Sequence, residues 1–209
     1  MIALFGVLLM TYLMVVARRM TALIRGFAYS SFFLCVLTFS AARTEKSTEL
    51  YVIAVLLFVV KVALIPWFLA RISRAVQAEE SPGLLLNPML SLAAAVLLTY
   101  MAHLFAGRVM GVADYGRISA FAVSLSVTLI GLFLMIFRMR ALAQVVGLLT
   151  MENGLFLAAI AVCGGMPFFV EIALFFDVFM CVLILGMFVY RINRLFTHID
   201  VSRLNGLKG

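Results

Sequence analysis

Charged residues are scarce in this sequence, and their scarcity excludes most soluble folds. Asp, Glu, Lys and Arg make up 12% of the 209 residues, whereas hydrophobic residues make up 66%. Soluble domains carry about 25% charged residues, and about half of their residues are apolar. The apolar residues also come in long runs, such as 2–17 and 121–137, instead of alternating between a polar and an apolar face. The composition therefore indicates an integral membrane protein with no room for a separate soluble catalytic domain.

The motifs of soluble enzymes and of metal sites are missing as well. The three cysteines form no CxxC pair and each lies in an apolar run, so we expect neither a disulfide framework nor a cysteine metal site. There is no glycine-rich phosphate loop, no His/Cys cluster and no nucleophile elbow in the sequence. We therefore expect no cofactor, no metal and no catalytic residue in this chain. The net charge of +7 is typical of basic residues beside membrane spans, and without a soluble module no nucleic-acid binding is expected.

Hydrophobic runs of about 20 residues predict an all-α, polytopic membrane helix bundle with about seven transmembrane helices. Polar stretches and Gly/Pro breaks separate the runs. The predicted spans are 1–17, 22–41, 50–69, 84–106, 118–137, 141–163 and 168–190. With the N-terminus outside, 11 Lys and Arg residues lie on the inner side and 4 on the outer side. The positive-inside rule therefore predicts an N-out/C-in chain with a cytoplasmic tail, 191–209.

Four ionisable residues lie inside the predicted spans, where each charge costs about 2.5–3.5 kcal/mol on insertion scales. They are Lys61, Glu152, Glu171 and Asp177. Glu152 and Asp177 lie near the middle of adjacent antiparallel spans, so we expect them at similar depth. Burial favours the protonated form of a carboxyl group, which is the property that a proton relay needs. Glu171 lies nearer the outer surface and is either a further relay site or an exposed end residue.

Lys61 lies mid-span, too deep to reach either surface, and we expect it to face a carboxylate or a hydrated cavity. Pro66 leaves a carbonyl one turn earlier without its donor and favours a bend beside the lysine. Asn153 and Gln144 are candidate supporting polar residues, and Asn153 either solvates Glu152 or holds a helix interface. The structural alternative for all of these groups is pairing with a neighbouring helix or a partner subunit.

Small residues on the sixth span, among them Gly147 and Gly154, predict close packing against another helix.

Residues 144–154 (QVVGLLTMENG) resemble the component E membrane subunit of hydrogenase-4-type, formate hydrogenlyase-like, energy-converting nickel–iron (NiFe) hydrogenases. Three further segments agree with that family: 61–66 (KVALIP), 170–177 (VEIALFFD) and 199–209 (IDVSRLNGLKG). The last three spans also resemble the K-type subunit of complex I and the related antiporter C-type subunit. In that comparison Glu152 takes the place of the first mid-membrane glutamate, and Asp177 or Glu171 takes the place of the second.

The resemblance implies a four-helix N-terminal membrane extension, 1–117, and a three-helix K-type-like module, 118–209. It implies a non-catalytic subunit in the inner (cytoplasmic) membrane of a prokaryote, in contact with lipids and with antiporter-like and core membrane subunits. A peripheral hydrogenase arm of partner subunits would carry the nickel–iron centre and iron–sulfur clusters. This chain would couple that redox chemistry to proton or sodium translocation. Two alternatives stay open: a purely structural connector between membrane subunits, and a component of a multisubunit cation/proton antiporter.

Overall fold

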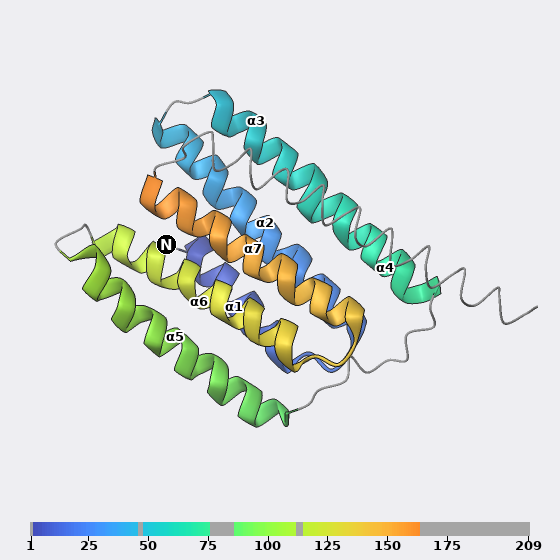
Figure 1. Cartoon of the computed structure of the whole chain (residues 1–209). Coiled ribbons are helices and arrows are strands. Elements are labelled where there is room, and N and C mark those ends of the chain that lie inside the picture. Colours follow the sequence, from blue (N-terminus) through green and yellow to red (C-terminus); the bar gives the residue numbers. More distant parts are fainter. Residues whose placement is uncertain (1, 46–47, 76–85, 112–114, 164–209) are drawn as a thin grey trace, which may run out of the picture. The chain divides into compact units, whose positions relative to one another are not determined.

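The computed structural model describes residues 2–45, 48–75, 86–111 and 115–163, which lie within the first of two compact units, 1–173 and 174–209 (Figure 1). Regular structure in these ranges is helical. The elements are α1 (Ile2–Val16), α2 (Met20–Glu45), α3 (Thr48–Leu57), η1 (Phe58–Leu64), α4 (Ile65–Ala75), α5 (Pro88–Met110), α6 (Tyr115–Phe137) and α7 (Ala141–Cys163). The predicted all-α membrane bundle is confirmed.

The described helices lie where membrane spans were predicted, but fewer of them are long enough to cross a membrane. Five described helices are long and apolar enough to cross a membrane: Met20–Thr44, Ala54–Arg74, Pro88–Met110, Tyr115–Phe137 and Ala141–Val162. Helix α1 is apolar but has only 15 residues, fewer than the roughly 20 that a straight span needs. The predicted seventh span, 168–190, lies outside the described residues. The N-out/C-in direction stays a prediction.

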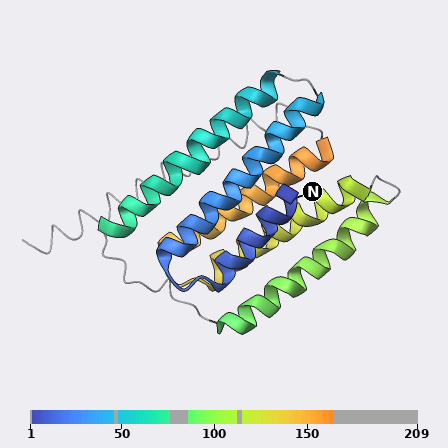
Figure 2. The same cartoon turned by 180° about the vertical axis from the view of Figure 1, so that it is seen from behind.

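Helices α3, η1 and α4 follow one another without a break and pack along α2 (Figures 1 and 2). Helix α7 packs against both α2 and α6, and α1 packs against α2, α5 and α6. Helix α5 contacts α1 and α6. A hydrogen bond of 2.6 Å between the hydroxyl groups of Tyr12 and Thr99 joins α1 to α5. The contacts of α7 with α2 and of α2 with η1 are the ones that position the candidate site.

The distribution of buried and exposed side chains is that of a membrane protein and not that of a soluble protein. Large apolar side chains such as Phe5, Leu97 and Val55 are more than half exposed, whereas Lys61 and Glu152 are buried. Soluble proteins seldom expose contiguous apolar surface, because water disfavours it. Exposed apolar side chains on successive helices are suited to lipid, so the described helices form a multi-pass membrane bundle.

Glycines allow α6 and α7 to pack with their backbones in contact. A methyl group at Gly147 of α7 would lie 2.6 Å from the backbone nitrogen of Met135 in α6. A methyl group at Gly154 would meet Thr128, and one at Gly131 would meet the backbone of Met151. Real side chains do not approach this closely, so only glycine fits these crossings. The packing role predicted for Gly147 and Gly154 is confirmed.

Candidate functional site

Lys61 lies in a π-helical turn, η1, in the middle of the helix that runs from α3 to α4. The N–H of Ile65 bonds to the carbonyl of Val60, five residues earlier. Pro66 has no N–H to donate to the carbonyl of Val62, so the regular α-helical ladder is interrupted at this point. A wider turn upstream of a proline is one way in which a helix accommodates that interruption, and such turns are frequent at functional sites. Lys61 is the buried residue of this turn, with 1% of its surface exposed.

The ammonium group of Lys61 forms an ion pair with Glu152 of α7. Its Nζ lies 3.0 Å from the Oε1 of Glu152, and the two side chains are 1% and 5% exposed. The same Nζ donates a hydrogen bond of 3.2 Å to the Oδ1 of Asn153. Its distance to the ring centroid of Phe156 is 5.9 Å, so an aromatic face covers part of the ammonium. The cation therefore has a charged, a polar and an aromatic neighbour on one helix.

Asn153 connects this pair to α2. Its Oδ1 accepts from Lys61, and its Nδ2 donates a hydrogen bond of 2.9 Å to the Oγ of Ser31. Asn153 and Ser31 are both buried. We call Lys61, Glu152, Asn153 and Ser31 the Lys61 cluster. It joins the three helical elements α2, η1 and α7 through side chains alone.

The Lys61 cluster lies at the middle of each helix that contributes to it. Lys61 is 13 residues after Thr48 and 14 before Ala75, in one continuous helix. Glu152 is 11 residues from each end of α7, and Ser31 is 11 residues after the start of α2. At 1.5 Å per residue, 11 residues correspond to about 16 Å of helix. Half of the hydrocarbon core is about 15 Å thick, which places the cluster near the midplane.

Chemically, the cluster consists of a proton donor and a proton acceptor in direct contact. Moving the proton from Nζ to the carboxylate would convert an ion pair into a neutral amine and carboxylic acid. In a low-dielectric interior the charged and neutral forms of such a pair lie closer in free energy than in water. Among the residues that the structure describes, no group of three or more His, Cys, Asp or Glu side chains is placed to hold a metal ion. The cluster therefore holds one exchangeable proton between an amine and a carboxylate.

A second buried cation, Arg138, lies in the turn between α6 and α7 and is 1% exposed. Its guanidinium donates to the carbonyls of Met14 (2.8 Å), Val15 (3.1 Å) and Ala17 (3.0 Å). The last carbonyls of a helix have no partner within the helix, so Arg138 caps the C-terminal end of α1. Burial lowers the pKa of Arg138 to about 10, which leaves it protonated at neutral pH.

Comparison with known proteins identifies relatives along nearly the whole chain. Hydrogenase-4 component E of Escherichia coli K12 is 27% identical over 206 residues, which are 98% of this chain and 95% of that protein. Hydrogenase-4 component E of Shigella flexneri gives the same figures. The chain is thus similar to hydrogenase-4 component E over nearly its whole length. The uncharacterized protein Rv0085 of Mycobacterium tuberculosis is 28% identical over 206 residues, 97% of this chain and 93% of that protein. No family model and no solved structure matches the chain.

The similarity to hydrogenase-4 component E confirms the family resemblance that the segment 144–154 suggested. Of the two environments predicted for Lys61, a carboxylate or a hydrated cavity, the structure shows the carboxylate, which is Glu152 of that segment. Asn153 contacts Lys61 and Ser31, so it joins helices beside Glu152. Gln144 lies elsewhere, where its Nε2 donates to the carbonyl of Arg138 at 2.8 Å and closes the turn before α7.

The two remaining predicted site residues, Glu171 and Asp177, lie outside the described residues. Their pairing with Glu152 stays a prediction. Sequence reasoning missed Ser31, although a serine in the middle of a long apolar run was a signal. It also interpreted Arg138 only as an inner-side charge, because no local pattern connects it to α1.

Proposed function

We propose that this chain is a membrane-arm subunit of a complex I-like, energy-converting hydrogenase in the inner membrane of a prokaryote. Its homologue in Escherichia coli is named as a component of hydrogenase-4, and its own apolar helices suit a membrane position. In this proposal the chain is not catalytic by itself. Partner subunits carry the nickel–iron centre and iron–sulfur clusters, and antiporter-like and core membrane subunits are its neighbours.

The proposed role is to couple redox chemistry in the peripheral arm to proton or sodium translocation. The observation that carries this role is the ion pair of Lys61 and Glu152, buried at the middle of two helices that both pack on α2. Ionisable groups are costly at that depth, and in membrane proteins they mark ion paths and proton relays. A change of charge in the arm would shift the proton between Nζ and the carboxylate. Asp177 and Glu171 are the proposed further stations.

A second candidate is a purely structural connector, and one observation favours it. The polar atoms of the Lys61 cluster are bonded to one another from three helices, which is also what a static joint between helices requires. In this case the cluster holds α2, η1 and α7 together and no ion passes.

Replacement of Glu152 by Gln separates the two candidates. Glutamine keeps the shape and one acceptor oxygen of glutamate but has neither the charge nor a titratable proton. The intact complex with Glu152→Gln should assemble, retain dye-linked hydrogen turnover and lose ion uptake into proteoliposomes. Uptake is followed with a pH-sensitive dye, with and without sodium, against a protonophore as the zero level.

Thr150→Val is the matched control. Thr150 is buried on the same helix, and its hydroxyl donates to the carbonyl of Val146, one turn earlier. This variant should leave both hydrogen turnover and ion uptake unchanged. If Glu152→Gln assembles like Thr150→Val and keeps full ion uptake, the ion path is wrong and the connector is favoured.

A further inference from the structure

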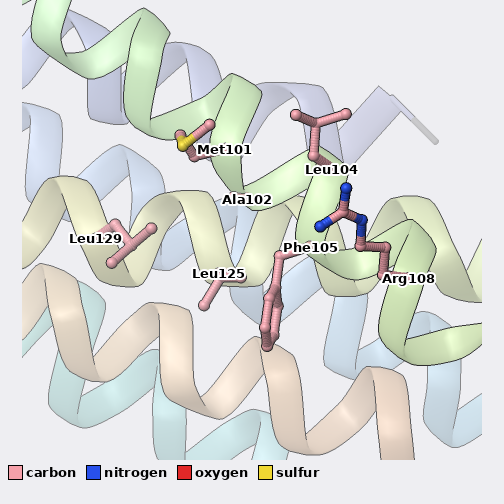
Figure 3. A pocket seen from close by; sticks show the side chains of 7 residues that line it. All are labelled: Met101, Ala102, Leu104, Phe105, Arg108, Leu125 and Leu129. Atoms are coloured by element: carbon pink, nitrogen blue, oxygen red, sulfur yellow. The ribbon is translucent and has the colours of Figure 1, made fainter.

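An open apolar groove lies between α5 and α6, away from the Lys61 cluster (Figure 3). Met101, Phe105 and Arg108 of α5 line it together with Leu125 and Leu129 of α6. Its volume is about 540 Å³, within the range of small-ligand sites. In Figure 3 the side chain of Arg108 lies at one end of the groove, and Met101 and Leu129 lie toward the other end.

The groove extends from the end of the helices to about the depth of one lipid leaflet. Arg108 is two residues before the end of α5, and Met101 is seven residues further back. At 1.5 Å per residue, Met101 is therefore about 10 Å deeper than Arg108. Leu129 is 14 residues after the start of α6, or about 21 Å along that helix. One leaflet of hydrocarbon is about 15 Å thick, so the groove matches the reach of an acyl chain from the headgroup level.

The surface of the groove itself is apolar, and the guanidinium beside it is positively charged. Arg108 is the one charged residue among its lining side chains. A guanidinium matches phosphate oxygens in two-point hydrogen bonds, and basic residues at this level attract anionic headgroups. The remaining lining residues are apolar and present Met101 and Phe105 at about half exposure.

We propose that the groove binds one anionic phospholipid, with its headgroup phosphate at Arg108 and an acyl chain between α5 and α6. An anionic headgroup is favoured over a zwitterionic one, because it lacks the ammonium that would repel Arg108. The acyl chain covers the apolar side chains of α5 and α6 that line the groove. This inference is independent of the ion path, since neither helix contributes to the Lys61 cluster.

The test measures lipid binding to the full chain, purified in mild detergent and stripped of lipid, by native mass spectrometry. Phosphatidylglycerol is the probe and phosphatidylcholine is the comparison lipid. One phosphatidylglycerol should bind more tightly than any further one. Arg108→Gln should weaken that binding about fivefold, the effect of removing one basic residue near a headgroup. Leu125→Trp, which fills the groove, should abolish it.

Arg117→Gln is the matched control, because Arg117 is an exposed arginine near the start of α6 that does not line the groove. It should bind phosphatidylglycerol like the unaltered chain. Equal losses in Arg108→Gln and Arg117→Gln would mean attraction by general surface charge and would overturn the site. A photo-reactive residue at position 125 that crosslinks to another polypeptide of the intact complex, and not to lipid, would also overturn it. Since Arg108 is exposed, Arg108→Gln keeps the test valid even if Leu125→Trp fails to fold.

Discussion

Removing one member of the ion pair between Lys61 and Glu152 should destabilise the bundle far more than removing both. Lys61→Met keeps the length of the side chain but leaves the Glu152 carboxylate at mid-membrane without its cation. It also removes the donor to Asn153, whose Oδ1 loses a hydrogen bond of 3.2 Å. The double variant Lys61→Met with Glu152→Met replaces the buried pair with two apolar side chains of similar volume.

The expected magnitudes follow from the burial of both groups. Leaving a buried charge uncompensated costs about 3–5 kcal/mol, whereas exchanging a whole buried pair for apolar residues is about neutral or stabilising. The two single variants should therefore each lose about 3–5 kcal/mol, and with a neutral double variant the coupling energy of the double-mutant cycle should be about 6–10 kcal/mol in magnitude. For a chain of this size, such a loss lowers the midpoint of thermal unfolding by about 10 °C.

The midpoint of thermal unfolding is measured in detergent for all four proteins of the cycle. Each protein is a fluorescent fusion, and size-exclusion chromatography shows how much of it remains folded after heating. Lys61→Met and Glu152→Met should each unfold at lower temperature, and the double variant should recover most of the loss. Additive losses, with the double variant the least stable, would refute the direct pairing of the two side chains. A Lys61→Met variant as stable as the unaltered chain would show that Lys61 does not lie against a charge.

Three further perturbations test the packing. Gly147→Ala should lower the free energy of unfolding by about 1–3 kcal/mol, because the methyl group would meet the α6 backbone. Gly107→Ala, where a methyl group has nothing within 4 Å, should instead stabilise α5 by up to about 1 kcal/mol. The midpoint of thermal unfolding measures both effects. Arg138→Gln should lower the midpoint of thermal unfolding and speed proteolysis at the end of α1, because three carbonyls lose their charged donor. Arg19 is exposed, so the control variant Arg19→Gln should change neither quantity. Tyr12→Phe removes the hydroxyl that bonds across to α5 and should cost about 0.6 kcal/mol, the average for such bonds in membrane bundles.

The sequence predicted where the helices lie better than where they end. The span predicted at 141–163 coincides with α7. The span predicted at 50–69 is part of a helix that continues to Ala75, through Arg71 and Arg74. Hydropathy reports the part of a helix that lies in lipid, and a helix can continue into the headgroup region with polar residues. The π-helical turn at Lys61 was also not predicted, because Pro66 indicates an interruption without saying how the helix accommodates it.

For the candidate site, the sequence predicted how deep Lys61 and Glu152 lie in the membrane but not that the two residues lie beside each other. Counting residues from the ends of the spans placed Lys61 and Glu152 at mid-membrane, and the structure places both at the middle of their helices. All apolar spans have similar compositions, so no sequence pattern indicated that η1 and α7 both pack on α2. The environment of Lys61 could therefore only be predicted as a carboxylate or a hydrated cavity, and its partner Glu152, 91 positions further along the chain, could not be named.

The contact of Arg138 with α1 has a consequence for the order of biosynthesis. The carbonyl of Ala17 and the guanidinium that binds it are 121 residues apart in the chain. At about 5–20 residues per second of translation, α1 waits roughly 6–24 s after its own synthesis before Arg138 is made. During that interval the end of α1 depends on water or on the insertion machinery for its hydrogen bonds. Packing of α1 on α2 can precede the capping of its C-terminal end by Arg138, and a ribosome that stalls before residue 138 leaves that end without this cap.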